Sequence, residues 1–474
     1  MELSRRTFLG GGTALLAAAG GSGCGRTVRT DRPRLKLGVI ADPHIGTSWM
    51  MGINTPATEQ AFRRFRSQGV DAVAVLGDFT DGGTVEQMKE FARCWYAVFP
   101  DDRGRDGRRV EKMILTGNHD VACWKAPSKQ DGSYIVPHIA ELWRDVFHEE
   151  YAAAWRREIN GFQFTGSNWD FVHPRADVRD CHWKSDLEPH LKEAFARARP
   201  GEPVFHLRHG PVPGTTYCSG SHPFGDATEL FGDDPRLFVM FGHIHKPFTH
   251  PCSIWQGNYT ALSAGVVTWP DFPPFTWPHE MPGGVVYAKS QCLISVYGDE
   301  IVIERTNVLT GAMLGPLWRI PLPLSPATFP YTAERIRARA GMPAFLAGAT
   351  LSATVGMGEN VLWKVPPTMK AVQGKGGILL TFPAACVPDS PDDMVMRYSV
   401  AVRRADDGRE VASRDFVTEF YLGREYLRNT YQFLFEAERL PANVACTFAV
   451  KAVDFFGNES VPIVSEPVAF RRCL

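Results

Sequence analysis

Five short motifs in this chain bring together the kinds of side chain that ligate divalent metal ions in proteins. The motifs are Asp42-Pro43-His44, Gly77-Asp78, Gly117-Asn118-His119-Asp120, His209-Gly210-Pro211 and Gly242-His243-Ile244-His245. A mixed set of carboxylate, amide and imidazole ligands suits two neighbouring hard-to-borderline ions better than one structural zinc ion. Two such ions, about 3.5–4 Å apart, can clamp and activate an in-line displacement at phosphorus. The motifs therefore predict a two-metal centre that hydrolyses a phosphoester.

The spacing within the motifs indicates how the ligands divide between two ions. Asp78 is the natural bridge, because a carboxylate can offer oxygens to two cations. Asp42 and His44 lie two residues apart on a chain that leaves a strand, so both side chains can turn toward one ion. His243 and His245 have the same spacing, which places both imidazoles on one face of an extended segment. A water between the ions would lose its proton near neutral pH and attack as a metal-bridging hydroxide.

The third motif adds a neutral ligand and a proton donor. Asn118 offers an amide oxygen, which limits the negative charge that an anionic substrate must approach. His119 then faces the oxygen of the leaving group, and Asp120 is available to orient its ring. Such a pair suits a general acid that also stabilises developing charge. We therefore predict His119 and Asp120 as the catalytic residues.

Each motif follows a short apolar run that is typical of a buried strand. The runs cover residues 35–40, 71–76, 112–115, 203–207 and 237–241. Apolar runs rich in β-branched residues and bounded by glycine are expected where both faces of a strand are buried. Helical spacing of apolar residues over 58–69 predicts a βαβ unit between the first two runs. In α/β sheets, ligands bind at the carboxyl ends of the strands, where all five motifs lie.

These residues resemble the calcineurin-like metallophosphoesterase superfamily, whose pattern is D-x-H, G-D-x-x, G-N-H-[DE], a lone histidine before small residues, and G-H-x-H. The resemblance extends over about residues 35–310 and implies a four-layer α/β/β/α sandwich domain at 33–322. It also implies one role for each motif residue. One ion would be held by Asp42, His44, Asp78 and His245, and the other by Asp78, Asn118, His209 and His243, with His119 as the catalytic histidine.

Two features of the motifs narrow this expectation. Phe79 and Thr80 follow Asp78 where purple acid phosphatases carry their iron-bound tyrosine, which disfavours a purple iron enzyme. Both His206 and His209 lie at the fourth motif, and we choose His209 because Gly-Pro follows it. The nitrogen and oxygen ligands fit Mn, Zn or Fe, so the identity of the two divalent metal ions stays open.

The first 24 residues resemble an export signal. Ser4-Arg5-Arg6-Thr7-Phe8-Leu9 is the twin-arginine pattern, and a modest apolar stretch extends to Ala19. This segment predicts export across the bacterial inner membrane by the twin-arginine machinery, to the periplasm or cell envelope. Gly21-Ser22-Gly23-Cys24 is similar to a lipoprotein box, so a lipidated Cys24 would attach the protein to the membrane. Simple signal cleavage at Ala17-Ala18-Ala19 is the alternative. The net charge of −1 argues against a dedicated nucleic-acid-binding protein.

The rest of the chain predicts one insert and a second domain. Residues 121–203 form an insert that we expect to be largely helical, over 137–159 and 186–199. Alternating residues at 293–297 and 301–304 predict a hairpin that completes the second sheet of a two-sheet domain. A Pro-rich linker is expected at 323–360.

Residues 361–474 predict a small β-sandwich. We expect strands at 377–381, 396–403, 416–421 and 447–453. The segment 440–460 resembles the end of a fibronectin type III domain, and an immunoglobulin-like sandwich of another type stays open.

Aromatic residues near the motifs suggest contacts with the substrate. Trp124 follows Asp120 closely and is a candidate for the mouth of the site. The loop 268–278 is dense in proline and aromatic residues, and it either forms a wall or lid of the site or fills a domain interface.

A phosphodiester is the favoured substrate, because Asn118-His119 with a helical cap resembles the cyclic-nucleotide and glycerophosphodiester branch of the superfamily. A phosphomonoesterase is the alternative, for which Arg208 or Lys125 would supply an additional cation. The second alternative is a non-catalytic binding module of the cell envelope on the same fold.

Overall fold

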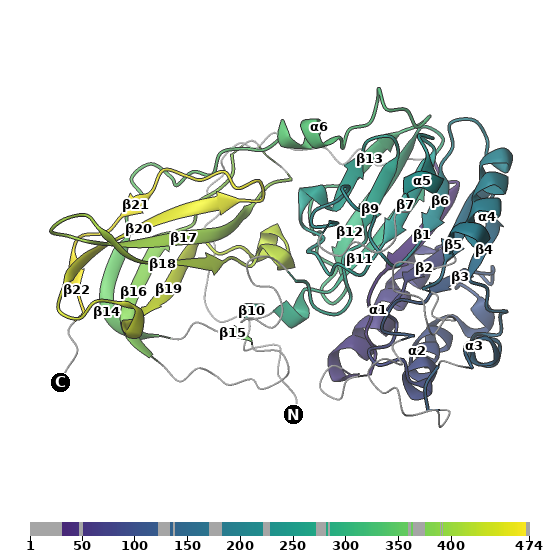
Figure 1. The fold of residues 1–474 in the computed structure, drawn as a ribbon, viewed down its shortest axis with the longest axis horizontal. Coiled ribbons are helices and arrows are strands. Elements are labelled where there is room, and N and C mark those ends of the chain that lie inside the picture. The colour runs from purple at the N-terminus through teal and green to yellow at the C-terminus, as the bar shows by residue number, and fades with distance from the viewer. Residues whose placement is uncertain are drawn as a thin grey trace. The chain divides into compact units, whose positions relative to one another are not determined.

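We describe the fold from a computed structural model of the chain (Figure 1). The description covers residues 31–46, 51–121, 133–135, 138–169, 183–220, 228–271, 281–282, 285–358, 362–363, 375–388, 390 and 392–470. Residues Pro33–Leu474 form one compact unit. The predicted signal segment with Cys24 lies outside the described residues, as do Trp124 and Lys125. Among the residues described, no helix has the length and apolar character needed to cross a membrane.

The first sheet carries the first three motifs. Its strands, in spatial order, are β13 (Trp318–Pro321), β12 (Glu300–Asn307), β11 (Ser290–Val296), β1 (Leu35–Ile40), β2 (Ala72–Leu76) and β3 (Glu111–Leu115). β1, β2 and β3 are parallel, so their carboxyl ends lie at one edge. β11 pairs antiparallel with β1, so the predicted hairpin is correct, but it extends this first sheet and not the second. The alternation of buried residues on β11 does not identify its neighbour.

Helices cover one face of the first sheet. They are α1 (Met51–Gln68), α2 (Val85–Val98) and α3 (Ile139–Phe147) (Figure 1). Phe62 of α1 and Phe91 of α2 are fully buried in one cluster with Val75 of β2. The adjacent residue Leu76 faces the opposite side and joins a different core cluster. β2 is therefore buried on both faces, as its uninterrupted apolar run predicts.

The second sheet carries the last two motifs. Its spatial order is β4 (Ala154–Ile159), β5 (Phe162–Ser167), β6 (Val204–Leu207), β7 (Leu237–Phe241), β9 (Thr260–Ser263) and β8 (Ile254–Gln256). β5, β6, β7 and β9 are parallel. Leu191 of α4 (Trp183–Arg197) and Phe231 of α5 (Thr228–Phe231) pack on β7. On its other face, Phe205 of β6 shares one core with Val39 of β1 from the first sheet.

The insert contains two strands, and the first of them lies where we expected a helix. α3 ends at Phe147, and His148 caps it in the left-handed conformation at φ 58°. Residues 154–159 then form β4, which pairs antiparallel with β5 through a turn at Asn160 and Gly161. The predicted helix over 137–159 is therefore wrong beyond residue 147, whereas α4 lies close to the predicted 186–199.

The C-terminal region is rich in β-structure. One sheet has the order β14 (Ser352–Gly358), β16 (Lys375–Pro383) and β19 (Thr430–Glu436). The other contains β18 (Glu410–Val417), β17 (Val395–Arg404), β20 (Ala445–Asp454), β21 (Ile463–Val464) and β22 (Val468–Ala469). Buried residues of both sheets, such as Leu380 and Val400, share one core.

Two details of this region differ from the sequence-based expectation. β14 begins at Ser352, inside the segment predicted as a linker, because its residues pair with β16. β18 ends at Val417, and Phe420–Leu422 forms a 3-10 turn where we expected the strand to continue. The Thr418 hydroxyl donates to the Val395 carbonyl at this point and draws the chain out of the sheet.

Several short elements complete the described structure. They are α6 (Ala333–Arg337), β10 (Met281–Pro282), β15 (Leu362–Trp363) and the 3-10 turns Pro100–Asp102, Pro251–Ser253, Val285–Tyr287, Arg424–Tyr426 and Ala437–Arg439.

Candidate metal centre

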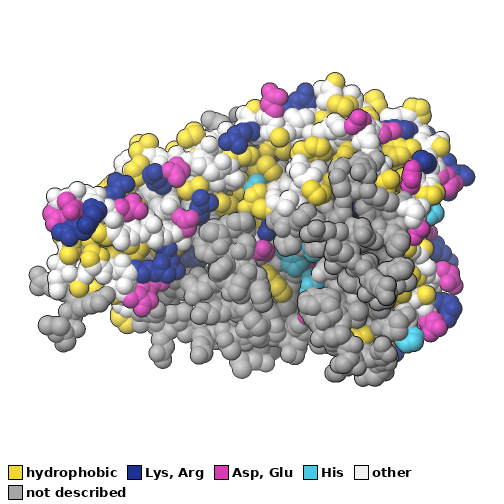
Figure 2. All heavy atoms as spheres, viewed as in Figure 1, with side chains coloured by type: hydrophobic (Ala, Val, Ile, Leu, Met, Phe, Trp, Pro, Cys, Tyr) yellow, Lys and Arg dark blue, Asp and Glu magenta, His cyan; other side chains and the backbone are white. Residues whose placement is uncertain are grey.

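The five predicted motifs meet at the carboxyl ends of strands from both large sheets. Three groups of side chains place ligand atoms within 4.8 Å of one another. The groups are Asp42, His44 and His245; His44, Asp81 and His119; and Asp78, His209 and His243. Histidine side chains are visible at the surface on the face shown in Figure 2. The structure thus brings together residues that lie up to about two hundred positions apart in the sequence.

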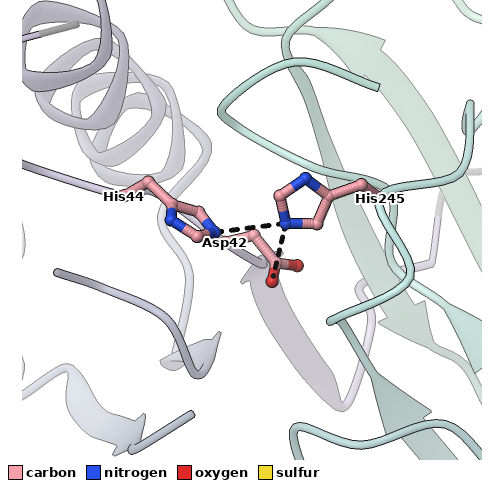
Figure 3. A group of neighbouring side chains, drawn as sticks. All are labelled: Asp42, His44 and His245. Atoms are coloured by element: carbon pink, nitrogen blue, oxygen red, sulfur yellow. Dashed lines mark hydrogen bonds and ion pairs between the residues drawn. The ribbon is translucent and has the colours of Figure 1, made fainter. Parts of the chain in front are cut away.

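One half of the centre consists of Asp42, His44 and His245, whose side chains point toward one another (Figure 3). The Nε2 atoms of the two histidines lie 3.1 Å apart. His245 Nε2 also lies 3.4 Å from Asp42 Oδ1. Two imidazole nitrogens and a carboxylate oxygen therefore converge on one small volume. This donor set fits a divalent cation, which would attract all three lone pairs.

The other half is arranged around His209. Its Nε2 lies 3.0 Å from Asn118 Oδ1, 3.2 Å from Asp78 Oδ2 and 3.2 Å from His243 Nδ1. Its Nδ1 lies 2.7 Å from the Leu76 carbonyl oxygen, so Nδ1–H donates there and Nε2 is the nitrogen that faces the centre. A backbone carbonyl that fixes the tautomer of a ligand histidine is a common feature of metal sites.

Asp78 joins the two halves. Its Oδ2 lies 3.2 Å from His209 Nε2 and 3.6 Å from His44 Nε2. Its Oδ1 accepts a hydrogen bond of 2.7 Å from the His119 amide. This position between ligands of both halves is the one that a bridging carboxylate requires.

Charges within the centre favour an ionised Asp78. Burial alone would raise the pKa of Asp78, but the charges of His209, His119 and His44 and the hydrogen bond from His209 hold it well below its usual value. Burial lowers the pKa of His209, but the charge and hydrogen bond of Asp78, the charge of Asp42 and the bond to the Leu76 carbonyl together raise that pKa to about 9. The carboxylate is therefore ready to bind a cation.

Most of the candidate ligands have an unusual backbone conformation. Positive φ angles occur at Asp42 (52°), His44 (47°), Asp78 (47°), His243 (68°) and His245 (48°). Residues other than glycine rarely adopt this left-handed conformation, and such strain clusters at functional sites. The left-handed conformation changes the direction of the chain just after the strand that precedes each residue. Consecutive loops are also tied together, since the His44 amide donates to the Asp78 carbonyl at 2.9 Å.

Glycines in the motifs leave room for the ligands. A Cβ atom added at Gly117 would lie 2.2 Å from Asp78 Oδ1, and one added at Gly77 would lie 2.4 Å from His209 Nδ1. At Gly242 the nearest atom would be Asp42 Oδ2 at 2.5 Å. Any larger residue at these positions would displace a ligand.

Asp120 has a different role from the predicted one. It does not orient the His119 ring, because its carboxylate accepts hydrogen bonds from Thr80 N (2.7 Å), Thr80 Oγ1 (2.7 Å), Gly117 N (2.7 Å) and Phe79 N (3.3 Å). These bonds join the loops that follow β2 and β3. Burial, followed by the negative charge of Asp78, raises the pKa of Asp120 to about 7.

Asp81 takes the place that we predicted for Asp120, and the sequence analysis missed it. Its Oδ1 lies 3.2 Å from His44 Nδ1 and 3.8 Å from His119 Nδ1. Its carbonyl oxygen lies 2.8 Å from His119 Nδ1. A carboxylate on the outer nitrogen of a ligand histidine orients the ring and raises its basicity. The sequence feature that could have identified Asp81 is its position in the same loop as Asp78, three residues further along.

The two histidines of the fourth motif point to different sides of the second sheet. Phe205 and Leu207 of β6 face the core between the sheets, so His206 faces the opposite side, where its ring lies 5.3 Å from Phe231. Burial and the charge of Arg208 lower the pKa of His206 to about 3. His209 follows the end of β6 and reaches the centre.

Separate replacement of the two histidines by leucine tests this assignment. We expect His209→Leu to remove one metal ion per chain and to lower the rate of phosphoester hydrolysis by at least about 100-fold. His206→Leu should retain both ions, because its ring is remote from the ligands. Metal content by mass spectrometry and initial rates are the measurements, and the reverse pattern would reassign the fourth ligand to His206.

Comparison with known proteins identifies the class of this domain. Residues 35–247 match the calcineurin-like phosphoesterase family. The chain therefore contains a calcineurin-like metallophosphoesterase domain, and the candidate centre lies within it. None of the curated proteins matches the chain.

Several solved structures are similar to part of the chain at low identity. A dimetal phosphatase from Danio rerio has 12% identity and a TM-score of 0.37, and the match covers 62% of this chain and 100% of that one. A conserved uncharacterised protein, described as a predicted phosphoesterase, from Streptococcus pneumoniae has 13% identity and a TM-score of 0.26, over 60% and 97%. Vps29 from Entamoeba histolytica, complexed with Zn²⁺, has 12% identity and a TM-score of 0.25, over 60% and 99%.

Proposed function

We propose that the protein is a binuclear metal-dependent phosphoesterase that hydrolyses a phosphodiester. The position of Asp78 Oδ2, 3.2 Å from His209 Nε2 and 3.6 Å from His44 Nε2, is the observation that carries this proposal. It supports two ions that share one carboxylate. When bound, the two ions would supply an activated nucleophile and neutralise charge at phosphorus.

The proposed ligand sets are those expected from the sequence. One ion takes Asp42, His44, Asp78 and His245, and the second takes Asp78, Asn118, His209 and His243. Nitrogen and oxygen donors of this kind suit Mn, Zn or Fe. The strained ligand conformations and the glycines that make room for them support a site built for metal ions.

In this proposal His119 protonates the leaving group. Its Nδ1 lies 2.8 Å from the Asp81 carbonyl oxygen, which assigns the proton on that nitrogen and directs Nε2 elsewhere. The Asp81 carboxylate lies 3.8 Å from the same nitrogen. The His119 side chain is 24% exposed, so a substrate can reach it.

Replacement of His119 by alanine should separate catalysis from metal binding. We expect His119→Ala to lower kcat by about 10²–10⁴-fold, the usual contribution of a general acid, while both ions stay bound. Rates on p-nitrophenyl esters and metal analysis of the same samples check this result. Loss of an ion together with activity would make His119 a ligand.

The class of ester is tested by two chromogenic substrates. The purified protein, supplied with Mn²⁺, is assayed on bis-p-nitrophenyl phosphate and on p-nitrophenyl phosphate. A rate ratio well above one supports the diesterase, and a ratio well below one supports the alternative monoesterase. No turnover of either ester with two ions bound would reject hydrolysis and favour the non-catalytic envelope module.

We also propose an exported protein with two domains. The twin-arginine pattern supports transport to the periplasm or cell envelope, and Cys24 is the proposed lipid attachment site. We assign the catalytic domain to an α/β/β/α sandwich and the C-terminal region to a fibronectin- or immunoglobulin-type sandwich, supported by the shared cores of their sheets. Cell fractionation tests the location: a protein confined to the cytoplasm would reject export.

A further inference from the structure

Trp269 lies beside the ligands of one half of the centre. The centroid of its ring lies 6.1 Å from the centroid of the His245 ring, and the two rings meet edge to face. The same indole lies 6.4 Å from the His44 ring. Its side chain is only half-buried, so part of the indole stays accessible. A flat apolar surface therefore borders the position where an ester would bind.

The chain around Trp269 is tied to the ligand loops on both sides. The Thr268 amide donates to the Asp42 carbonyl at 3.1 Å. The Asp271 amide donates to the His245 carbonyl at 2.6 Å. Because these bonds lie immediately before and shortly after Trp269, they fix the indole relative to two proposed ligands.

A buried lysine also links the loop that contains Trp269 to the loop that contains His44 by hydrogen bonds. Lys289 is 1% exposed, and its Nζ donates to Asn54 Oδ1 at 2.6 Å and to the Val267 carbonyl at 2.9 Å. The Asn54 amide in turn donates to the His44 carbonyl at 3.2 Å. The loop with Trp269 and the loop with His44 thus share one hydrogen-bond network.

Trp269 also packs against an apolar cluster. The cluster combines Val285 and Val286 with Met394, Phe420 and Phe455 of the C-terminal region. Part of the loop 268–278 therefore fills a contact between the catalytic domain and the C-terminal region. The sequence left two alternatives for this loop, a wall or lid of the site and a filled domain interface. Trp269 contacts the cluster that the two regions share, and residues 272–278 lie outside the described residues.

The second tryptophan at the centre provides a contrast. Trp169 lies 5.7 Å from the His209 ring and 5.8 Å from the His243 ring, beside the other group of ligands. It is 9% exposed, so its surface is used in packing. Trp269 is the more accessible of the two indoles.

We propose that Trp269 determines substrate specificity by contacting a flat aromatic group carried by the phosphoester. This inference rests on the proposed function, since it places phosphorus between the ligands of the centre. Aromatic rings attract one another at centroid distances of about 4.5–7 Å, in offset-stacked or edge-to-face arrangements. A rigid indole about 6 Å from the ligand rings is within reach of a ring bonded to a phosphoryl group. An aliphatic group of the same size gains less from this contact.

Two phosphonates of similar size, compared at a pH at which both are dianions, test the contact without turnover. Dissociation constants of phenylphosphonate and cyclohexylphosphonate are measured by calorimetry on the Mn²⁺-loaded protein. We expect the phenyl compound to bind about 3- to 10-fold more tightly. Trp269→Leu should bring this ratio close to one, and Trp269→Phe should retain part of it. Trp255→Leu is the matched control, because Trp255 is also half-buried but lies on the edge strand β8.

A second pair of ligands separates the possible sources of the aromatic group. Adenosine 5′-monophosphate carries a nucleobase where ribose 5-phosphate carries a hydroxyl group. If Trp269→Leu abolishes a preference for adenosine 5′-monophosphate, the aromatic group belongs to a nucleotide. If the substitution affects only the preference for phenylphosphonate over cyclohexylphosphonate, the substrate is a simple aryl ester.

Each result decides the proposal. A phenyl preference that persists in Trp269→Leu, or an equal loss of affinity for both phosphonates, would reject a specificity role. If that variant does not fold, Trp269→Met removes the flat surface with a flexible side chain. Phosphonate binding with the expected ratio but without hydrolysis of any ester would reject the proposed hydrolase and leave the Trp269 contact intact.

Discussion

Asp78→Asn is expected to lose phosphoesterase activity by at least about 10³-fold and to lose bound metal. A carboxylate that bridges two cations contributes several kcal/mol of charge stabilisation, and about 1.4 kcal/mol corresponds to a factor of ten in rate. Asparagine supplies one neutral oxygen and an N–H₂ group. Because Oδ2 lies near His209 Nε2 and His44 Nε2, the substitution affects both halves of the centre.

The control for this variant is Asp71→Asn. Asp71 lies immediately before β2, the strand whose other end leads to Asp78, and its carboxylate accepts from the Lys36 amide and pairs with Arg108. We expect this variant to keep both ions and full activity. Turnover and metal content per chain are measured on both proteins. If Asp78→Asn lost activity but kept two ions, Asp78 would not be the bridging ligand.

Gly117→Ala is the second substitution with a large expected effect. An alanine Cβ would lie 2.2 Å from Asp78 Oδ1, 2.5 Å from the Asp78 amide nitrogen and 2.7 Å from His209 Nε2. Contacts below 3.0 Å require movement, and the backbone nitrogen of Asp78 has little freedom to move. We expect one methyl group to displace the bridging carboxylate and to lower both metal content and activity by at least about 100-fold.

Gly298→Ala provides the comparison for that variant. Gly298 lies in the turn between β11 and β12, and an added Cβ would meet no atom within 4 Å. This change should leave metal content and turnover unaltered. Mass spectrometry of the metals, circular dichroism and initial rates are recorded for both proteins. A Gly117→Ala protein with two ions and normal rates would show that the ligand loops are more adaptable than their contacts suggest.

The strands that lead to the motifs were predictable because burial on both faces leaves an uninterrupted apolar run. All five predicted runs coincide with strands, from β1 at Leu35–Ile40 to β7 at Leu237–Phe241. The carboxyl ends of parallel strands share an edge, and this rule was enough to place Asp42 after β1 next to Asp78 after β2.

In the insert, the spacing of apolar residues was not enough to distinguish a helix from a strand. Residues 154–159 are charged at several positions, and we interpreted them as the continuation of a helix. The better signal was Asn160-Gly161, where both residues have positive φ angles and connect β4 to β5. Asn-Gly between two runs with alternating apolar residues is a strong hairpin signal.

The assignment of carboxylates to rings could not be predicted from the sequence. Asp120 follows His119 directly, yet its carboxylate turns to the amides of Thr80 and Gly117, and Asp81 lies beside the His119 ring. The direction of each side chain depends on loop dihedral angles, and several of these loops use left-handed residues. Sequence patterns identify candidate groups at such a site, whereas backbone conformation decides which of them meet.

The ligands of the centre come from both large sheets. Asp42, Asp78 and Asn118 follow strands of the first sheet, whereas His209 and His243 follow strands of the second. In the proposed ligand sets each ion therefore joins the two sheets and acts as a cross-link between them. A small slip of one sheet along the other would separate the candidate ligands of both proposed sets at once. Occupancy of the site then also stabilises the folded domain by mass action, to an extent set by the free metal concentration.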